Sequence, residues 1–141
     1  MYTSVVKSQD QALAHLFFHC CLEDDNFTAA EMDDLSVKLV ILGLNTRINT
    51  KDELVAYRSY RAAIPDEQLY IRYLLSLIKP VNELALYSWC VELCIDDPTF
   101  DAREEAMLHK ISVELGLDNI DAKVVRNCIA QRKAVELKKI F

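Results

Sequence analysis

The chain has 141 residues, of which 22 are acidic and 16 are basic, so its formal net charge is -6. An acidic surface repels a polyphosphate backbone unless the basic residues gather on one face, which argues against nucleic-acid binding. Apolar residues make up 52% of the chain, but it has only 2 glycines and 3 prolines. This scarcity of turn residues disfavours an all-β fold and favours long helices.

Apolar periodicity and end signals predict about seven helices. Three pairs have the spacing of a capping box, namely Thr28 with Glu31, Thr50 with Glu53, and Asp101 with Glu104. Gly43 and Gly116 are typical helix terminators, and Pro65 suits the first position of a helix. The predicted helices span residues 4–23, 28–43, 50–63, 65–78, 81–95, 101–115 and 120–139.

The sequence contains an internal repeat. An offset of 73 aligns residues 12–44 with residues 85–117 without a gap, and 12 of these 33 positions are identical. The identical pairs include Cys21 with Cys94, Phe27 with Phe100, and Gly43 with Gly116. Two helix-loop-helix units with the same ends indicate a duplication. We therefore expect a single all-α domain over residues 1–141, a closed bundle containing the two units as a pseudo-symmetric pair.

Negative charge is concentrated in the equivalent loops of this repeat. Residues 21–34 hold six acids and no base, and residues 96–105 hold five acids and one base. The helix macrodipole favours acids in a first helical turn but disfavours them at a helix C-terminus. The acids at the disfavoured positions, the ends of the first and fifth predicted helices, are Glu23, Asp24, Asp25, Asp96 and Asp97.

These carboxylates predict a site for a divalent cation such as Ca²⁺, Mg²⁺ or Mn²⁺ in each loop, because hard cations prefer oxygen ligands. Asp24 and Glu31 are seven residues apart, a spacing that can fold carboxylates toward one point, and the second loop repeats it. The candidate ligands are Asp24, Asp25, Glu31, Asp96, Asp97 and Glu104. Two alternatives stay open: hydrated turns with good helix caps, and an acidic docking surface for a basic partner.

The segment from Glu23 to Glu31, Glu-Asp-Asp-Asn-Phe-Thr-Ala-Ala-Glu, resembles a motif of the tellurite-resistance TerB family, and residues 96–104 resemble the same motif. The usual family pattern is Ala-Asp-Gly-x-Ile-Ser-x-x-Glu, whose glycine is replaced here by Asp25 and Pro98. The resemblance covers roughly residues 12–130. It implies an all-helical fold and a stress-response context, since members include stand-alone tellurite-resistance proteins and domains fused to J-domain cochaperones.

Histidine and cysteine side chains form a second group of candidates. A soft-metal site is conceivable because residues four apart can bind a metal from one helical face. Ordinary core packing is the alternative, because free cysteine is commonly buried. The residues concerned are His15, His19, Cys20, Cys21, Cys90 and Cys94.

Tyrosines and arginines alternate in the third and fourth predicted helices. This pattern is more typical of tyrosines that hold two helices together, with their hydroxyls reaching water, than of a nucleic-acid surface. The residues are Tyr57, Tyr60, Tyr70 and Tyr73, with Arg58, Arg61 and Arg72 between them.

The sequence favours a non-enzymatic protein that binds a protein partner. No nucleophile motif, phosphate-binding glycine loop or zinc helix occurs in it. The last predicted helix is basic and can dock on an acidic surface, including the loops of a second copy in a homodimer. We expect a cytoplasmic protein, because the cysteines follow no disulfide pattern and the N-terminus lacks signal-peptide features. We expect no membrane span, because the apolar runs are too short.

Overall fold

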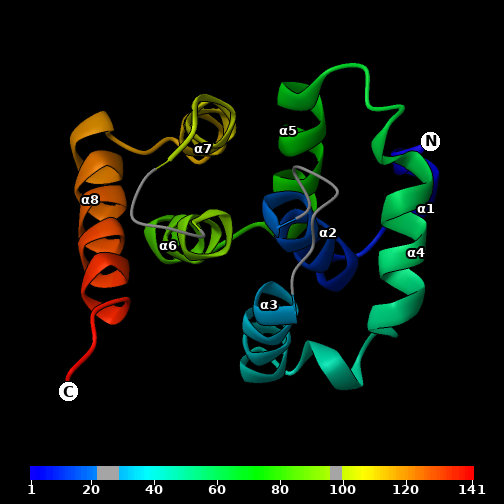
Figure 1. Cartoon of the computed structure of the whole chain (residues 1–141). Coiled ribbons are helices and arrows are strands. Elements are labelled where there is room, and N and C mark those ends of the chain that lie inside the picture. The colour runs from blue at the N-terminus through cyan, green and yellow to red at the C-terminus, as the bar shows by residue number, and fades with distance from the viewer. Residues whose placement is uncertain (22–28, 96–99) are drawn as a thin grey trace. The chain divides into compact units, whose positions relative to one another are not determined.

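The computed structural model describes residues 1–21, 29–95 and 100–141. Within these ranges the regular elements are α-helices and one 3₁₀ helix, connected by turns and loops, and no strand occurs (Figure 1). This confirms the all-α prediction. The same ranges contain eight α-helices, slightly more than the predicted number. They divide into two compact units, Met1–Pro80 and Val81–Phe141. The single closed bundle and its pseudo-symmetric pairing stay predictions.

The first unit contains α1 (Tyr2–Val5), α2 (Gln9–Cys21), α3 (Ala29–Ile41), the 3₁₀ helix η1 (Leu44–Thr46), α4 (Thr50–Arg61) and α5 (Glu67–Ile78). Helix α2 is its centre, because every residue from Ala14 to Cys21 is buried. A helix that is apolar on all sides must be covered on all sides. Helices α3, α4 and α5 all contact α2 and supply this cover (Figure 1).

The prediction of one helix over residues 4–23 is wrong in its first part, since α1 and α2 are separate. Between them, Val6 is buried with extended backbone. The hydroxyl of Ser8 accepts the amide hydrogen of Gln11 (3.1 Å), while the Gln11 side-chain oxygen accepts that of Lys7 (3.0 Å). This reciprocal arrangement is close to a capping box and starts α2 as a new helix.

One predicted helix cap and one predicted helix start are also wrong. Helix α4 is capped by Asn49, whose side-chain oxygen accepts the amide hydrogen three residues on (3.2 Å), so Thr50 is the first helical residue. Helix α5 is capped in the same way by Asp66, so Pro65 precedes the helix. Asparagine and aspartate are among the best N-cap residues. Glu53 therefore has no capping role, and its side chain contacts α2.

The second unit contains α6 (Glu83–Cys94), α7 (Ala102–Glu114) and α8 (Asn119–Glu136). Helix α6 contacts both α7 and α8. Arg126 of α8 donates a hydrogen bond to the hydroxyl of the buried Tyr87 (3.0 Å), which fixes α8 against α6. Across the described ranges, no helix combines the length and hydrophobicity needed to cross a membrane.

The helix bounds follow the offset of the sequence repeat. Helix α7 begins and ends 73 residues after α3, and α6 ends 73 residues after α2. Gly43 and Gly116 follow α3 and α7 with φ angles of 73° and 69°. Only glycine adopts this left-handed conformation without strain. The same end signal thus operates in both units, while duplication itself stays an inference from the sequence.

We predict that Gly43→Ala and Gly116→Ala each lower the free energy of unfolding by about 1–2 kcal/mol, the strain of a left-handed L-residue. A Cβ added at either position meets nothing within 4 Å, so the loss is a backbone effect. Urea denaturation of both variants measures it, with Gly→Asn as a milder comparison at each site. A neutral alanine variant would contradict the left-handed assignment.

Candidate functional site

The acidic loops are only partly within the described residues. Asp24, Asp25, Asp96 and Asp97 lie outside them. Glu31 is in the first turn of α3. The described part of the chain contains no group of three or more histidine, cysteine, aspartate or glutamate residues that could hold a metal ion. The histidines and cysteines of the candidate soft-metal site therefore belong to no such group within the described residues. The two cation sites stay predictions.

Glu104 has the capping role that its position predicts. Its carboxylate accepts the amide hydrogen of Asp101 (3.0 Å), and the Asp101 carboxylate accepts that of Glu104 (2.7 Å). This reciprocal pair is a complete capping box at the start of α7. One oxygen of the proposed ligand Glu104 is therefore already engaged by backbone.

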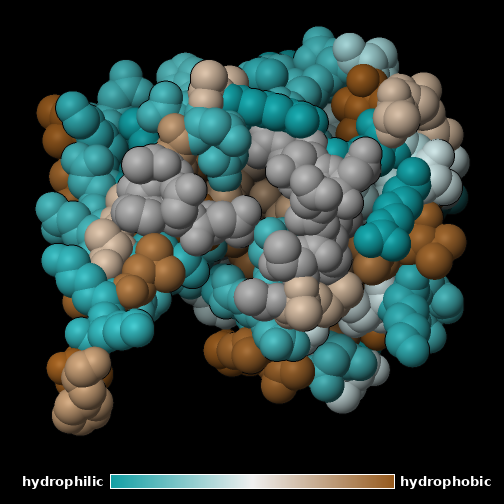
Figure 2. Space-filling model, viewed as in Figure 1, coloured by the Kyte–Doolittle hydropathy of each residue, from teal (hydrophilic) through white to brown (hydrophobic). Residues whose placement is uncertain are grey.

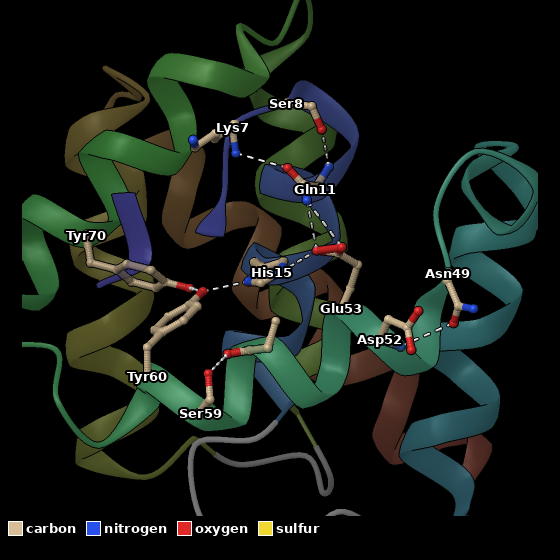
Figure 3. A network of polar contacts seen from close by, with 11 residues as sticks. Lys7, Ser8, Gln11, His15, Asn49, Asp52, Glu53, Ser59, Tyr60 and Tyr70 are labelled. Carbon is tan, nitrogen blue, oxygen red and sulfur yellow. Dashed lines mark hydrogen bonds and ion pairs between the residues drawn. The ribbon is translucent and has the colours of Figure 1, made fainter. Parts of the chain in front are cut away.

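The most developed polar site is a buried network in the first unit (Figure 3). His15, which has no exposed surface, lies between two partners from α4. Its Nδ1 is 2.6 Å from the Tyr60 hydroxyl, and its Nε2 is 2.9 Å from the Glu53 carboxylate. The Tyr60 hydroxyl is in turn 2.6 Å from that of Tyr70. Gln11 donates to both carboxylate oxygens of Glu53 (3.3 Å each).

One arrangement of protons satisfies all of these contacts. A carboxylate only accepts hydrogen bonds, so Glu53 accepts one from His15 Nε2–H. The Nδ1 atom of the neutral ring must then accept from the Tyr60 hydroxyl, whose oxygen accepts from Tyr70. The hydrogen bonds therefore run in one direction, from Tyr70 through Tyr60 and His15 to Glu53. Every donor and acceptor along this line has a partner, as a buried network requires.

A second histidine repeats the arrangement one turn along α2. His19 Nδ1 is 2.8 Å from the Tyr57 hydroxyl, and His19 Nε2 is 2.8 Å from the Glu67 carboxylate. Residues four apart share one helix face, so both rings lie on the side of α2 that faces α4 and α5. The carboxylates come from different helices, Glu53 from α4 and Glu67 from α5. The two histidines together attach α2 to both helices.

Aromatic rings enclose the hydroxyl end of the network. The Tyr2 ring packs against those of Tyr60, Tyr70 and Tyr73 at centroid distances of 6.1, 4.9 and 5.5 Å. The Tyr73 hydroxyl donates to the carbonyl of Val6 (2.5 Å). The expectation that the hydroxyls reach water is therefore wrong for Tyr57, Tyr60 and Tyr70, because these side chains are buried and each hydroxyl bonds to another group of the protein. Tyr73 is only partly buried.

Burial sets the electrostatics of this site. It lowers the pKa of His15 below the ordinary value of 6.5, although the hydrogen bond and the charge of Glu53 act in the opposite direction. Burial likewise raises the pKa values of Tyr57, Tyr60 and Tyr70. Both shifts favour neutral side chains, since desolvation opposes whichever form is charged. The histidine and the tyrosines are thus neutral hydrogen-bonding groups, and the line of hydrogen bonds ends on the Glu53 carboxylate.

The sequence contains a signal for this site, but patterns within single helices point to other roles. The spacing of the histidines suggests a metal site, the alternation of tyrosine with arginine suggests a contact between helices, and the position of Glu53 suggests a helix cap. What could have joined them is the matching spacing on two helices, with His15 and His19 four apart and Tyr57 and Tyr60 three apart. Such spacing places each pair on one helix face.

Comparison with known proteins adds no further assignment. No protein-family model, curated protein or solved structure matches the chain. The resemblance to the TerB family therefore stays a prediction that depends on the two loop motifs.

We predict that Tyr60→Phe lowers the free energy of unfolding of the first unit by about 1–3 kcal/mol, because it leaves His15 Nδ1 and the Tyr70 hydroxyl buried without their common partner. Urea denaturation followed through hydrogen exchange of α2 measures this loss. The neighbouring Ser59→Ala is the matched control, because its hydroxyl bonds the Ala56 carbonyl at an exposed position. We expect that control to stay within about 0.5 kcal/mol of wild type; equal effects of the two variants would contradict the network.

Proposed function

We propose that the chain is a non-enzymatic, TerB-like module whose first unit responds to acid stress through the network around His15. The observation that carries this proposal is that a ring with no exposed surface has both nitrogens bonded, one to Tyr60 and one to Glu53. Each polar group of the network has a protein partner. This favours a responsive structural role over catalysis, in which a ring nitrogen must reach a substrate.

Protonation of His15 has a defined structural effect. A charged ring donates from both nitrogens, so Nδ1 can no longer accept from Tyr60. The Tyr60 hydroxyl must turn toward Tyr70, and the Tyr70 hydroxyl must then find a new acceptor. Burial opposes the positive charge at the same time. Acid therefore favours states in which this part of α2 separates from α4 and α5.

Three titratable groups, all on α4, contact the His15 ring directly: Glu53, Tyr57 and Tyr60. The Glu53 carboxylate attracts a proton to the ring, and the two hydroxyls are neutral. The titratable groups one contact farther away are Tyr2 of α1, His19 and Cys20 of α2, Arg61 of α4 and Tyr70 of α5, and Glu67 of α5 lies beyond His19. The carboxylate nearest to the ring, Glu53, has a side chain that is 13% exposed.

We predict that the first unit loses stability as the pH falls below 6.5, the ordinary pKa of histidine. The folded-state pKa of His15 is lowered, so between that value and 6.5 the unfolded chain binds more protons than the folded one. Stability is then full above pH 6.5 and decreases as the pH falls toward the folded-state pKa. Hydrogen exchange of α2 amides between pH 8 and pH 5 measures the change.

His15→Gln removes the titrating ring, so it should flatten this pH dependence even if it lowers stability at every pH. The matched control is His109→Gln, which changes an exposed histidine of the second unit and should retain the wild-type profile. Identical pH profiles for wild type and His15→Gln would contradict the proposal that His15 causes the acid response.

A divalent-cation response is the second candidate function, and the shared helix bounds favour it. Because α3 and α7 begin 73 residues apart, the acidic motifs precede equivalent helices. In this proposal Asp24, Asp25 and Glu31, and likewise Asp96, Asp97 and Glu104, supply oxygen ligands to Ca²⁺, Mg²⁺ or Mn²⁺. The alternative is an interaction domain whose acidic loops bind a basic protein without an ion.

We predict that calorimetric titration with Ca²⁺, Mg²⁺ or Mn²⁺ gives a binding heat and that a binding ion raises the melting temperature, because a ligand that binds only the folded state stabilises it. Asp24→Asn combined with Asp97→Asn should abolish both effects, since each loop loses a carboxylate. In the absence of ion, stability should stay equal or rise, because both substitutions relieve unfavourable charge at helix ends. No heat at millimolar ion would contradict this candidate.

A further inference from the structure

Helix α3 has an exposed face that is acidic at its beginning and apolar at its end. Val37, Val40 and Ile41 are 56%, 58% and 66% exposed and have the spacing of one helical stripe. Asp33, exposed and four residues before Val37, extends this stripe toward the N-terminus. Hydrophobic atoms are visible in Figure 2 over the region that Figure 1 assigns to α3. We call Asp33, Val37, Val40 and Ile41 the α3 face.

Helix α8 has an exposed face of complementary character. Ile120, Val124 and Val135 are 73%, 53% and 64% exposed and lie on one stripe, opposite the buried Ala122. Basic side chains flank the stripe three residues from its members, Lys123 after Ile120 and Arg132 before Val135. We call Ile120, Lys123, Val124, Arg132 and Val135 the α8 face.

The charges on α8 are mainly positive. From Asn119 to Glu136 the helix has four basic residues (Lys123, Arg126, Arg132 and Lys133) and two acidic ones (Asp121 and Glu136). The Arg132 side chain is 82% exposed and pairs with Glu136 at 3.1 Å, a surface contact that costs little to exchange. Over residues 29–41, by contrast, α3 has three acids and one base, and that base, Lys38, is buried beside Asp34.

We propose that the α8 face of one copy of this chain docks on the α3 face of another. The charge on the α3 face is negative and the charge on the α8 face is positive, so neither homotypic pair gains a contact between opposite charges. The mixed pair joins opposite charges around apolar stripes. A second copy is the occupant that always presents both faces. Each face is one helical stripe, and stable specific interfaces bury at least about 1,200 Å² in total, so we expect a weak, reversible association.

The α3 and α8 faces contain none of the residues of the His15 network or the acidic-loop ligands. Self-association can therefore fail while the acid or cation response survives, and the reverse also holds.

Sedimentation equilibrium across a range of concentrations tests the proposal. The wild type should show a reversible mass above that of the monomer, and raising the salt from 0.05 to 0.5 M should weaken association. Asp33→Lys, and separately Lys123→Glu with Arg132→Glu, should each weaken it by about tenfold or more through like-charge contacts. Mixing these two variants should restore association, because the basic α3 face of one meets the acidic α8 face of the other.

The restored mixture also shows that both variants are folded. The matched control is Lys51→Glu with Glu83→Lys, two exposed positions of α4 and α6 outside both faces, and it should associate like wild type. A wild-type chain that stays monomeric up to millimolar concentration would overturn the proposal. Association that neither charge reversal weakens, or that mixing does not restore, would overturn it as well.

Discussion

His15 of α2 connects three helices at the centre of the first unit through buried hydrogen bonds, directly to α4 and through Tyr60 to α5. Its ring has no exposed surface, so neither nitrogen can exchange its bond for one to water. Its two nitrogens bond to Glu53 and Tyr60 of α4, and Tyr60 bonds in turn to Tyr70 of α5. Apolar packing would tolerate small rotations of α2, whereas these directional bonds define one orientation.

His19, one turn farther along α2, also bonds one tyrosine and one glutamate, namely Tyr57 and Glu67. Two polar anchors on one face of an otherwise apolar helix give the core a unique arrangement, at the expense of placing titratable groups inside it. The proposed acid response and the specificity of packing therefore have one physical origin. A phenylalanine core would pack as densely, but it would have neither property.

The sequence predicted those features that depend on local rules. Helix α7 starts at its Asp101 and Glu104 capping box and is followed by Gly116 in the left-handed conformation, both as expected. The rules failed where two local signals competed: Asn49, not Thr50, caps α4. The network around His15 was not predictable for a different reason: His15 and Glu53 are 38 residues apart in the sequence. No single-helix pattern shows which side chains tertiary packing will bring together.

The position of α2 at the centre of the first unit has a consequence for synthesis of the chain. Helix α2 comprises residues 9–21, and one of its covering helices, α5, comprises residues 67–78. A ribosome therefore releases the most buried helix of this unit well before that cover exists, and the unit cannot close until residue 78 has left the exit tunnel. During that interval α2 displays leucine, phenylalanine and cysteine side chains to the surroundings. A nascent-chain chaperone that shields apolar helices would have its natural substrate there.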